Sequence, residues 1–185
     1  MMMEKEIESY FNRYFHLNGG ERMKFEDIDW SCVYMYEELT DEFIEKTHRC
    51  LHQYLVFDTI PEKWSFVFEY NKVSEELLRK YCSEFDPEVW CVVSASQELS
   101  EDFMCVFKDK LNWVEISKNQ KFSKEFAIRF KLLLEWDVII CRSLFTFDFI
   151  LQNAVLTNDV VYRLGQIYTS DIGNVLERYR SEMKK

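Results

Sequence analysis

Large apolar side chains recur along the chain at the spacing of short amphipathic helices. Phe103 stands four residues before Phe107, and Phe126 stands four residues before Phe130. This spacing puts both members of a pair on one face of an α-helix, one turn apart. We expect each such helix to run for roughly ten residues, a length that is marginal in isolation, so its apolar stripe must pack against a neighbour.

The N-terminal segment has a helical pattern of its own. Apolar side chains follow the spacing i, i+3, i+4, i+7 and i+8 at Ile7, Tyr10, Phe11, Tyr14 and Phe15. The pattern predicts an amphipathic helix within residues 1–24 that ends before Gly19-Gly20 and caps the structure.

The five tryptophans mark a tandem repeat. They are Trp30, Trp64, Trp90, Trp113 and Trp136. Ten residues after each one stands a small hydroxyl residue, in turn Thr40, Ser74, Ser100, Ser123 and Thr146. Valine or isoleucine stands three residues after each tryptophan, and an apolar residue precedes each hydroxyl residue. Four columns that agree in all five rows define a repeat over residues 25–150.

The repeat settles to a constant length towards the C-terminus. Successive tryptophans are 34, 26, 23 and 23 residues apart. Counting 23 residues on from Thr146 reaches Thr169, which Ile172 and Leu176 follow. Residues 151–185 are therefore expected to hold a degenerate copy without tryptophan and a capping helix, because the outer face of a terminal repeat meets water.

Each hydroxyl residue has the position of a helix N-cap. In the string Leu99-Ser100-Glu101-Asp102 the serine is placed to accept from free backbone amides, and the two acids stand in the first turn near the positive end of the helix dipole. Similar acidic pairs recur at this place in other repeats, which favours capping over acid–base catalysis.

A second, shorter helix is expected to begin near each tryptophan. Pro61 and Pro87 both stand three residues before a tryptophan, and Asp86-Pro87-Glu88 has the pattern of an N-cap followed by proline at the first helical position. The tryptophans recur in register with Val and Ile, which favours burial between adjacent helix pairs over an exposed aromatic platform. The sequence thus predicts an all-α fold, a compact α-solenoid of stacked helix pairs in a single domain over residues 1–185.

Composition agrees with helices and excludes several other classes. Hydrophobic residues make up 48% of the chain, and only four glycines and two prolines are present, too few for an all-β fold with frequent turns. No apolar run is long enough to span a membrane, and the N-terminus lacks the pattern of a signal peptide. The six cysteines are scattered without a CxxC pair, which is typical of reduced, buried thiols. We therefore expect a soluble protein of the cytoplasm.

The net charge of −10 belongs to the first half of the chain. Residues 1–99 carry 21 acidic and 10 basic side chains, whereas residues 100–185 carry 12 and 13. An acidic surface repels nucleic acid and attracts basic proteins, so we expect a protein partner with a basic surface and no direct binding of nucleic acid. The alternative is that the acids serve solubility alone.

Residues with catalytic or metal-binding spacing are scarce. His48 and His52 stand four apart with Cys50 between them, a spacing suited to two zinc ligands on one helical face. No further ligand motif accompanies them, so a surface or half-buried histidine pair is the simpler interpretation. Phosphate-binding loops and nucleophile motifs are missing as well. We expect no catalytic residue, no metal and no cofactor, hence a protein that is not an enzyme.

Two strings give the chain a resemblance to known repeats. Residues 97–103 (QELSEDF) and residues 112–120 (NWVEISKNQ) resemble the short tandem "LSEDF…W…IS…Q" repeats found in proteins of bacteriophages and large DNA viruses. The resemblance covers about residues 25–150 and is closest over residues 97–130. It implies a helical-repeat protein of viral type, and it supplies no activity and no functional residue.

These patterns favour a module that binds another protein, in a viral setting a host or defence component. One candidate set is acidic and comprises Glu37, Glu38, Asp41, Glu42 and Glu45, of which the last four would share one helical face. The other set stands seven residues after each tryptophan and is expected on a groove of the stack; it comprises Glu37, Asn71, Gln97, Gln120 and Ser143. The alternative for the acidic set is helix capping and solubility.

A different class of function is a small-molecule binder with a pocket between repeats. A nucleotide-type ligand would need cations to converge in space, and the nearest candidates in sequence are Lys118, Lys121, Lys124 and Arg129.

Overall fold

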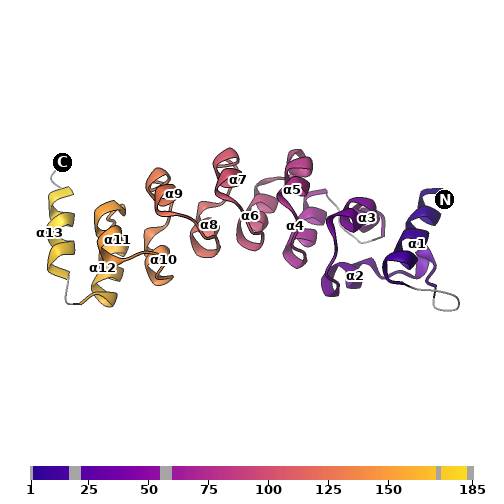
Figure 1. Cartoon of the computed structure of the whole chain (residues 1–185), viewed down its shortest axis with the longest axis horizontal. Helices are drawn as coiled ribbons and strands as arrows, with labels where there is room; N and C mark the ends of the chain where they lie inside the picture. Colours follow the sequence, from indigo (N-terminus) through magenta and orange to yellow (C-terminus); the bar gives the residue numbers. More distant parts are fainter. Residues whose placement is uncertain (1, 17–21, 55–59, 170–171, 183–185) are drawn as a thin grey trace. The chain divides into compact units, whose positions relative to one another are not determined.

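The protein is all-α over the part of the chain that its computed structural model describes, which comprises residues 2–16, 22–54, 60–169 and 172–182 (Figure 1). No strand occurs in these ranges. None of the helices described is both long and apolar enough to cross a membrane. The pair Gly19-Gly20, expected to follow the first helix, lies outside these ranges.

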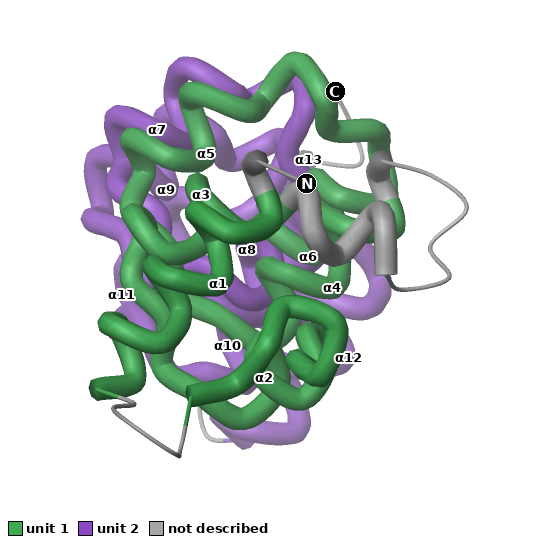
Figure 2. Tube along the Cα trace, turned by 90° about the vertical axis from the view of Figure 1, so that its right-hand side faces the viewer, with its two compact units in different colours: residues 1–93 green, residues 94–185 purple. Residues whose placement is uncertain are grey.

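Contacts divide the chain into two compact units, residues 1–93 and residues 94–185 (Figure 2). That both belong to one repeat domain stays a prediction. The helices of the first unit are α1 (Met2–Tyr14), α2 (Trp30–Tyr36), α3 (Asp41–Tyr54), α4 (Ile60–Tyr70), α5 (Glu75–Tyr81) and α6 (Pro87–Ser96), whose last turn enters the second unit. Short 3₁₀ turns, η2 (Phe25–Asp27) and η3 (Cys82–Glu84), join them.

The second unit continues the alternation of short helices. Its elements are α7 (Glu101–Val106), α8 (Trp113–Asn119), α9 (Lys124–Arg129), α10 (Trp136–Cys141), α11 (Phe147–Asn153), α12 (Asn158–Ile167) and α13 (Ile172–Glu182).

All five hydroxyl residues of the repeat cap a helix, as predicted. The Ser100 and Ser123 hydroxyls each accept from the backbone amide three residues on, at 3.1 Å. The same bond is made by Thr40, Ser74 and Thr146. Asp86 caps α6 in the same manner, and α6 begins at Pro87, where the sequence places the first helical residue.

The helices α7 and α9 are shorter than the roughly ten residues that the sequence predicts. The hydroxyl-capped helices α7 and α9 have six residues each, shorter than the tryptophan helices α6 and α8, which have ten and seven. Each short helix ends in a turn, because Phe107 and Phe130 leave the helical conformation at their C-caps. The apolar pairs persist across that end, since the rings of Phe103 and Phe107 lie 4.6 Å apart between centroids.

Hydrogen bonds in the second unit recur with the 23-residue period. The Ser94 hydroxyl accepts from the backbone amide of Asn112 at 3.0 Å, and 23 residues on the Ser117 hydroxyl accepts from that of Glu135 at 2.9 Å. The indole of Trp113 donates to the Lys108 carbonyl at 2.8 Å, and that of Trp136 donates to the Lys131 carbonyl at 2.9 Å. Equivalent residues therefore hold equivalent places in successive helix pairs.

Most tryptophans lie in the core, as expected. Trp30, Trp64, Trp90 and Trp136 are buried, whereas Trp113 is half-buried. Around Trp30 the first unit gathers a cluster of aromatic rings that includes Phe11 and Phe25, both 5.7 Å from it between centroids. The amphipathic helix α1 is thereby packed onto the first tryptophan helix.

The cysteines depart from the expected burial. Cys32 and Cys141 are exposed, and Cys82, Cys91 and Cys105 are half-buried; all five are free thiols. The position of the Cys50 side chain lies outside the described residues.

Residues 151–185, where the sequence predicts a degenerate copy and a capping helix, contain α12 and α13. Asp159 stands 23 residues after Trp136, and its helix α12 is capped by the Thr157 hydroxyl at 3.3 Å from the Val160 amide. α13 packs against α12 with Val175 buried, while Leu176 is half-buried.

Candidate protein-interaction surface

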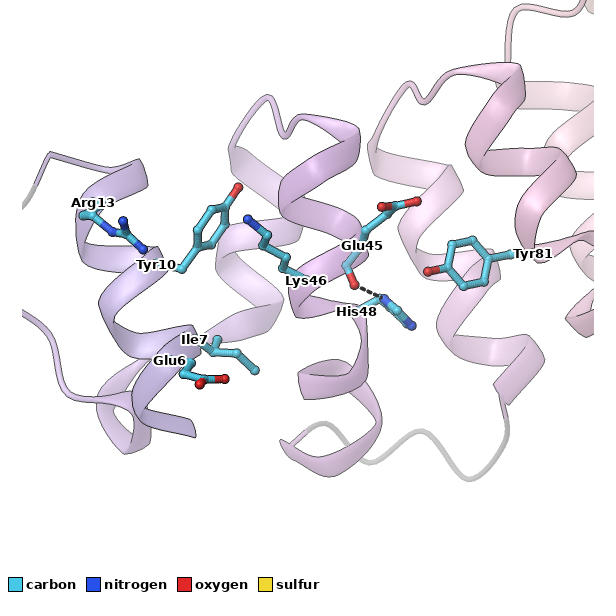
Figure 3. A pocket seen from close by; sticks show the side chains of 8 residues that line it. All are labelled: Glu6, Ile7, Tyr10, Arg13, Glu45, Lys46, His48 and Tyr81. Atoms are coloured by element: carbon cyan, nitrogen blue, oxygen red, sulfur yellow. Dashed lines mark hydrogen bonds between the residues drawn. The ribbon is translucent and has the colours of Figure 1, made fainter. Parts of the chain in front are cut away.

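A groove of about 380 Å³ opens in the first unit beside α1, α3 and α5 (Figure 3). Eight residues line it: Glu6, Ile7, Tyr10, Arg13, Glu45, Lys46, His48 and Tyr81. Figure 3 shows Tyr10 of α1 and Lys46 of α3 turned toward each other, and the Lys46 ammonium lies 4.1 Å from the centre of the Tyr10 ring. The same ammonium is 2.5 Å from Glu42 Oε1.

Several groove charges are compensated within the unit. Glu45 Oε1 lies 2.6 Å from Lys80 Nζ, and this hydrogen bond raises the pKa of Lys80 above its ordinary value. Burial, and next the nearby Glu42 carboxylate, raises the pKa of Tyr10, so this phenol stays protonated at neutral pH. Lys46 and Glu45 of the groove are therefore both paired with opposite charges of the same unit.

His48 is a packing residue of this unit. Its Nδ1 lies 3.1 Å from the Ile44 carbonyl oxygen and 2.9 Å from that of Glu45, so Nδ1 carries the proton. Its ring stacks on Trp64 with 5.2 Å between centroids. The side chain of His52, the other half of the proposed zinc pair, lies outside the described residues, among which no group of three metal-ligating side chains occurs.

The acidic set does not share one helical face. Glu37 is the C-cap of α2 and Glu38 follows it in the connection to α3, so the expected face contains only Asp41, Glu42 and Glu45. The helix is interrupted because Thr40 caps α3 through its own hydroxyl, which requires an extended residue before Asp41.

The three acids of α3 make intramolecular contacts. Asp41 accepts from the backbone amide of Ser74 at 3.2 Å, Glu42 pairs with Lys46, and Glu45 pairs with Lys80. In the second unit Glu101 accepts from the backbone amide of Ser123 in the same way, at 2.5 Å. An acid directly after one cap thus binds the amide of the next cap. Sequence spacing alone did not reveal this role, because the two partners are more than 20 residues apart.

Three amides of the second predicted set are buried, which corrects their expected place on a groove, whereas Glu37 and Ser143 are exposed. The side chain of Gln120 accepts from the backbone amide of Leu99 at 3.1 Å and donates to the carbonyls of Ser94 and Gln97 at 3.0 and 2.7 Å. Asn71 donates to the Tyr34 carbonyl at 2.9 Å, and Gln97 donates to the Ser96 hydroxyl at 3.1 Å. Gln120 and Asn71 thus satisfy backbone groups at the end of another helix, so they are not available to a partner.

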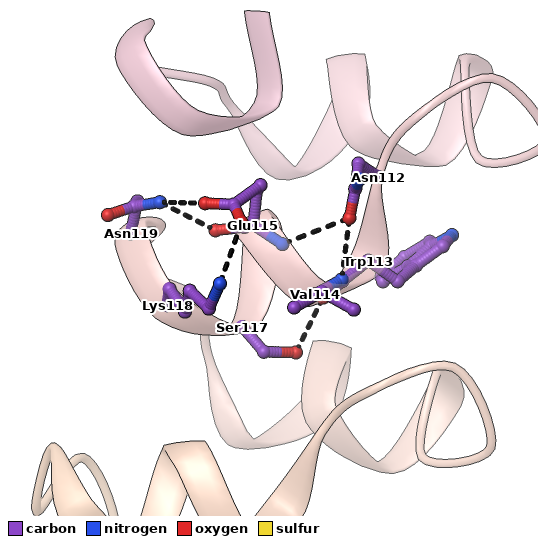
Figure 4. A network of polar contacts seen from close by, with 7 residues as sticks. All are labelled: Asn112, Trp113, Val114, Glu115, Ser117, Lys118 and Asn119. Carbon is purple, nitrogen blue, oxygen red and sulfur yellow. Dashed lines mark hydrogen bonds and ion pairs between the residues drawn. The ribbon is translucent and has the colours of Figure 1, made fainter. Parts of the chain in front are cut away.

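The candidate nucleotide-binding cations make separate contacts. Lys118 pairs with Glu115 at 2.8 Å, within a network on α8 that Asn112 and Asn119 complete (Figure 4). Lys124 lies over the Phe149 ring, and Arg129 lies over the Phe130 ring. Lys121 is exposed.

Two exposed tyrosines were not among the residues that the sequence predicted to bind a partner. Tyr36 and Tyr70 end α2 and α4, and 78% and 44% of their surfaces are exposed. α2 packs against α4, and the Asn71 bond to Tyr34 joins the ends of these two helices, so both tyrosines lie at the same end of the pair. Their equivalence could have been found in the sequence, since each stands six residues after a tryptophan.

Acidic residues are the sequence neighbours of both tyrosines. Glu37 and Glu38 follow Tyr36, and Glu69 precedes Tyr70; all three are exposed. We call Tyr36, Glu37, Glu38, Glu69 and Tyr70 the acidic tyrosine patch. It includes two of the acids predicted to bind a partner.

No protein-family model matches the chain, and no curated protein or solved structure matches it significantly.

Proposed function

We propose that this chain is a non-enzymatic interaction module whose first unit binds a basic segment of another protein through the acidic tyrosine patch. The observation that carries the proposal is the pair of exposed tyrosines, Tyr36 and Tyr70, at adjacent helix ends among exposed acids.

The chemistry of the patch suits lysine and arginine side chains. A cation over a tyrosine face gains about 0.5–1 kcal/mol at an exposed site, and a carboxylate beside it adds a charge-assisted hydrogen bond. Packed helices lie about 8–10 Å apart, so two equivalent tyrosines on neighbouring helices fit successive side chains of one extended segment. Carboxylates that flank both rings would disfavour an acidic segment.

The tyrosines are not needed to build the repeat. At the same position, six residues after the tryptophan, the other three repeats carry Ser96, Asn119 and Arg142. Because polar residues satisfy the fold there, the fold does not require an aromatic ring at this place, although the Tyr70 ring also contacts Phe66 at 5.1 Å between centroids.

The finer architecture and setting belong to the same proposal. Recurring caps and hydrogen bonds at a 23-residue period support helix pairs stacked as a compact α-solenoid, the geometry in which equivalent positions form one surface. The resemblance of residues 97–130 to viral repeats supports a partner from a host, such as a defence component, met in the cytoplasm.

The test is binding of a fluorescein-labelled dodecapeptide of alternating lysine and serine, followed by fluorescence anisotropy. We expect the double variant Tyr36→Ser/Tyr70→Ser to weaken binding at least tenfold, and Glu37→Gln/Glu38→Gln to weaken it severalfold. The matched control is Tyr162→Ser in the second unit, a tyrosine whose exposed fraction of 66% lies between those of Tyr36 and Tyr70.

Equal binding by the double tyrosine variant and the control would refute the patch as the site. Equal binding of a glutamate–serine peptide would refute the charge selectivity.

A further inference from the structure

A second groove, of about 320 Å³, lies within the second unit between α10 and α12. The turn before α10 supplies Lys131 and Leu132, and α10 and its N-cap supply Glu135 and Asp137. The opposite wall consists of the segment before α12 and its first turn, including Val155 and Asp159. The floor includes the buried ring of Trp136.

Leu132 stands at this groove with 80% of its surface exposed. In the preceding repeat the same place is taken by Asp109, 23 residues earlier. The two turns have the same backbone bonds, since Lys110 donates to the Phe107 carbonyl at 2.8 Å and Leu133 donates to the Phe130 carbonyl at 2.9 Å. An aspartate satisfies this turn, so folding does not require a leucine here. The exposed side chain of Leu132 is therefore available for an apolar contact with a partner.

The acids of the groove are also particular to this repeat. Glu135, Asp137 and Asp159 stand where the preceding copy has Asn112, Val114 and Trp136. Three carboxylates therefore border the groove against one lysine, Lys131. Within the part of the chain that the structure describes, none of the three forms an ion pair. The groove thus combines an exposed aliphatic side chain with an excess of negative charge.

We propose that this groove docks a short basic–apolar segment of a partner protein, with an arginine or lysine between Asp137 and Asp159 and an aliphatic side chain against Leu132. Charge complementarity selects this occupant, because an acidic segment would meet three like charges. The proposal goes beyond the acidic tyrosine patch, since it concerns other residues in the other unit and needs neither Tyr36 nor Tyr70.

The test uses a fluorescein-labelled dodecapeptide with arginine and leucine spaced four residues apart on one helical face. Two matched peptides replace every arginine by glutamate, or every leucine by serine. We expect the arginine–leucine peptide to bind at least tenfold more tightly than either, in a fluorescence anisotropy titration at low salt.

Variants of the protein locate the site. Asp137→Asn/Asp159→Asn and, separately, Leu132→Ser are each expected to weaken binding at least fivefold. The controls are Asp148→Asn, an exposed acid of α11, and Val106→Ser, an exposed apolar residue of α7; neither should change affinity. Far-ultraviolet circular dichroism checks that each variant is folded, and the asparagine pair preserves side-chain volume if Leu132→Ser is unstable.

Three outcomes would overturn the proposal. They are absence of binding, equal affinity for the glutamate peptide, and equal effects of groove and control variants. Concentration-dependent dimers in sedimentation velocity that Leu132→Ser abolishes would assign the groove to a second copy of this chain instead. The variant Tyr36→Ser/Tyr70→Ser should leave binding of the arginine–leucine peptide unchanged, so this proposal and the proposed function fail independently.

Discussion

Gln120 binds three backbone groups of residues 94–99 through a single buried amide. Its side-chain oxygen accepts a hydrogen bond from the Leu99 amide, and its side-chain nitrogen donates to the carbonyls of Ser94 and Gln97. Buried backbone groups that lose a partner are costly because no water replaces it. The side chain is therefore a structural residue at which two successive helix pairs are joined.

We expect Gln120→Ala to lower the free energy of unfolding by roughly 3 kcal/mol, because three buried backbone groups lose their partner. Gln152→Ala, on the exposed face of α11, should change it by less than about 0.5 kcal/mol. Urea denaturation followed by circular dichroism measures both. Similar values for the two variants would show that the buried amide is replaceable.

The stability of the start of α2 depends on pH through the carboxyl group of Asp29. Hydrogen bonds from the Ser31 hydroxyl, and next from the Cys32 amide, lower the pKa of Asp29 to about 2. A carboxyl group whose pKa is lower in the folded than in the unfolded state stabilises the fold above its unfolded pKa, near 4, and loses that contribution as pH falls toward about 2. The capped start of α2 is thus sensitive to acid.

We expect the Asp29 carboxyl to titrate near pH 2 in a carbon-detected NMR experiment, together with the amide of Cys32. In Asp29→Asn the cap is retained without a titrating group, so the Cys32 amide shift should stay flat over that range. A midpoint near 4 in the wild-type protein would contradict the hydrogen-bonded cap.

At the scale of the elements, each short helix depends on its cap and its packing rather than on its length. The helices α7 and α9 have six residues, too few to be stable alone. Their caps are reinforced across repeats, since Glu101 accepts from both the amide and the hydroxyl of Ser123. The Glu101 carboxylate therefore connects the starts of α7 and α9, two successive hydroxyl-capped helices.

We expect Ser123→Ala to cost more than a simple cap, roughly 2 kcal/mol against about 1 kcal/mol for Thr146→Ala, because it also removes a bond to Glu101. Thermal unfolding monitored by circular dichroism compares the two. Equal losses would mean that the contact between Glu101 and the Ser123 hydroxyl contributes little.

At the scale of the whole chain, most contacts join elements that are close in sequence. Contacts run from α2 to α3 and α4 in the first unit; in the second they run from α8 to α10 and from α10 to α12. The units also differ in charge, since residues 1–93 carry 20 acidic and 10 basic side chains and residues 94–185 carry 13 of each. Local contacts of this kind favour unfolding in parts rather than all at once.

We expect Trp64→Ala to cost about 3–5 kcal/mol and to expose the amides of residues 60–81 in hydrogen–deuterium exchange. Amides of α8 and α10 should keep their protection, because these helices pack within residues 94–185. Loss of protection throughout the chain would show instead that both units fold as one cooperative body.

What the sequence determined was the periodic part of this protein. Helix class, the five hydroxyl caps, the start of α6 at Pro87 and the burial of Trp30, Trp64, Trp90 and Trp136 follow from local spacing and capping chemistry, which act over a few residues. The tertiary structure decided the roles of the polar side chains. Gln120 and Asp41 bond to backbone groups more than 20 residues away, and Tyr36 and Leu132 are exposed at positions where other copies of the repeat carry polar residues. Periodicity specifies which face of a helix is buried, but a polar side chain's function depends on what the neighbouring helix places opposite it, and only the folded chain brings those groups together.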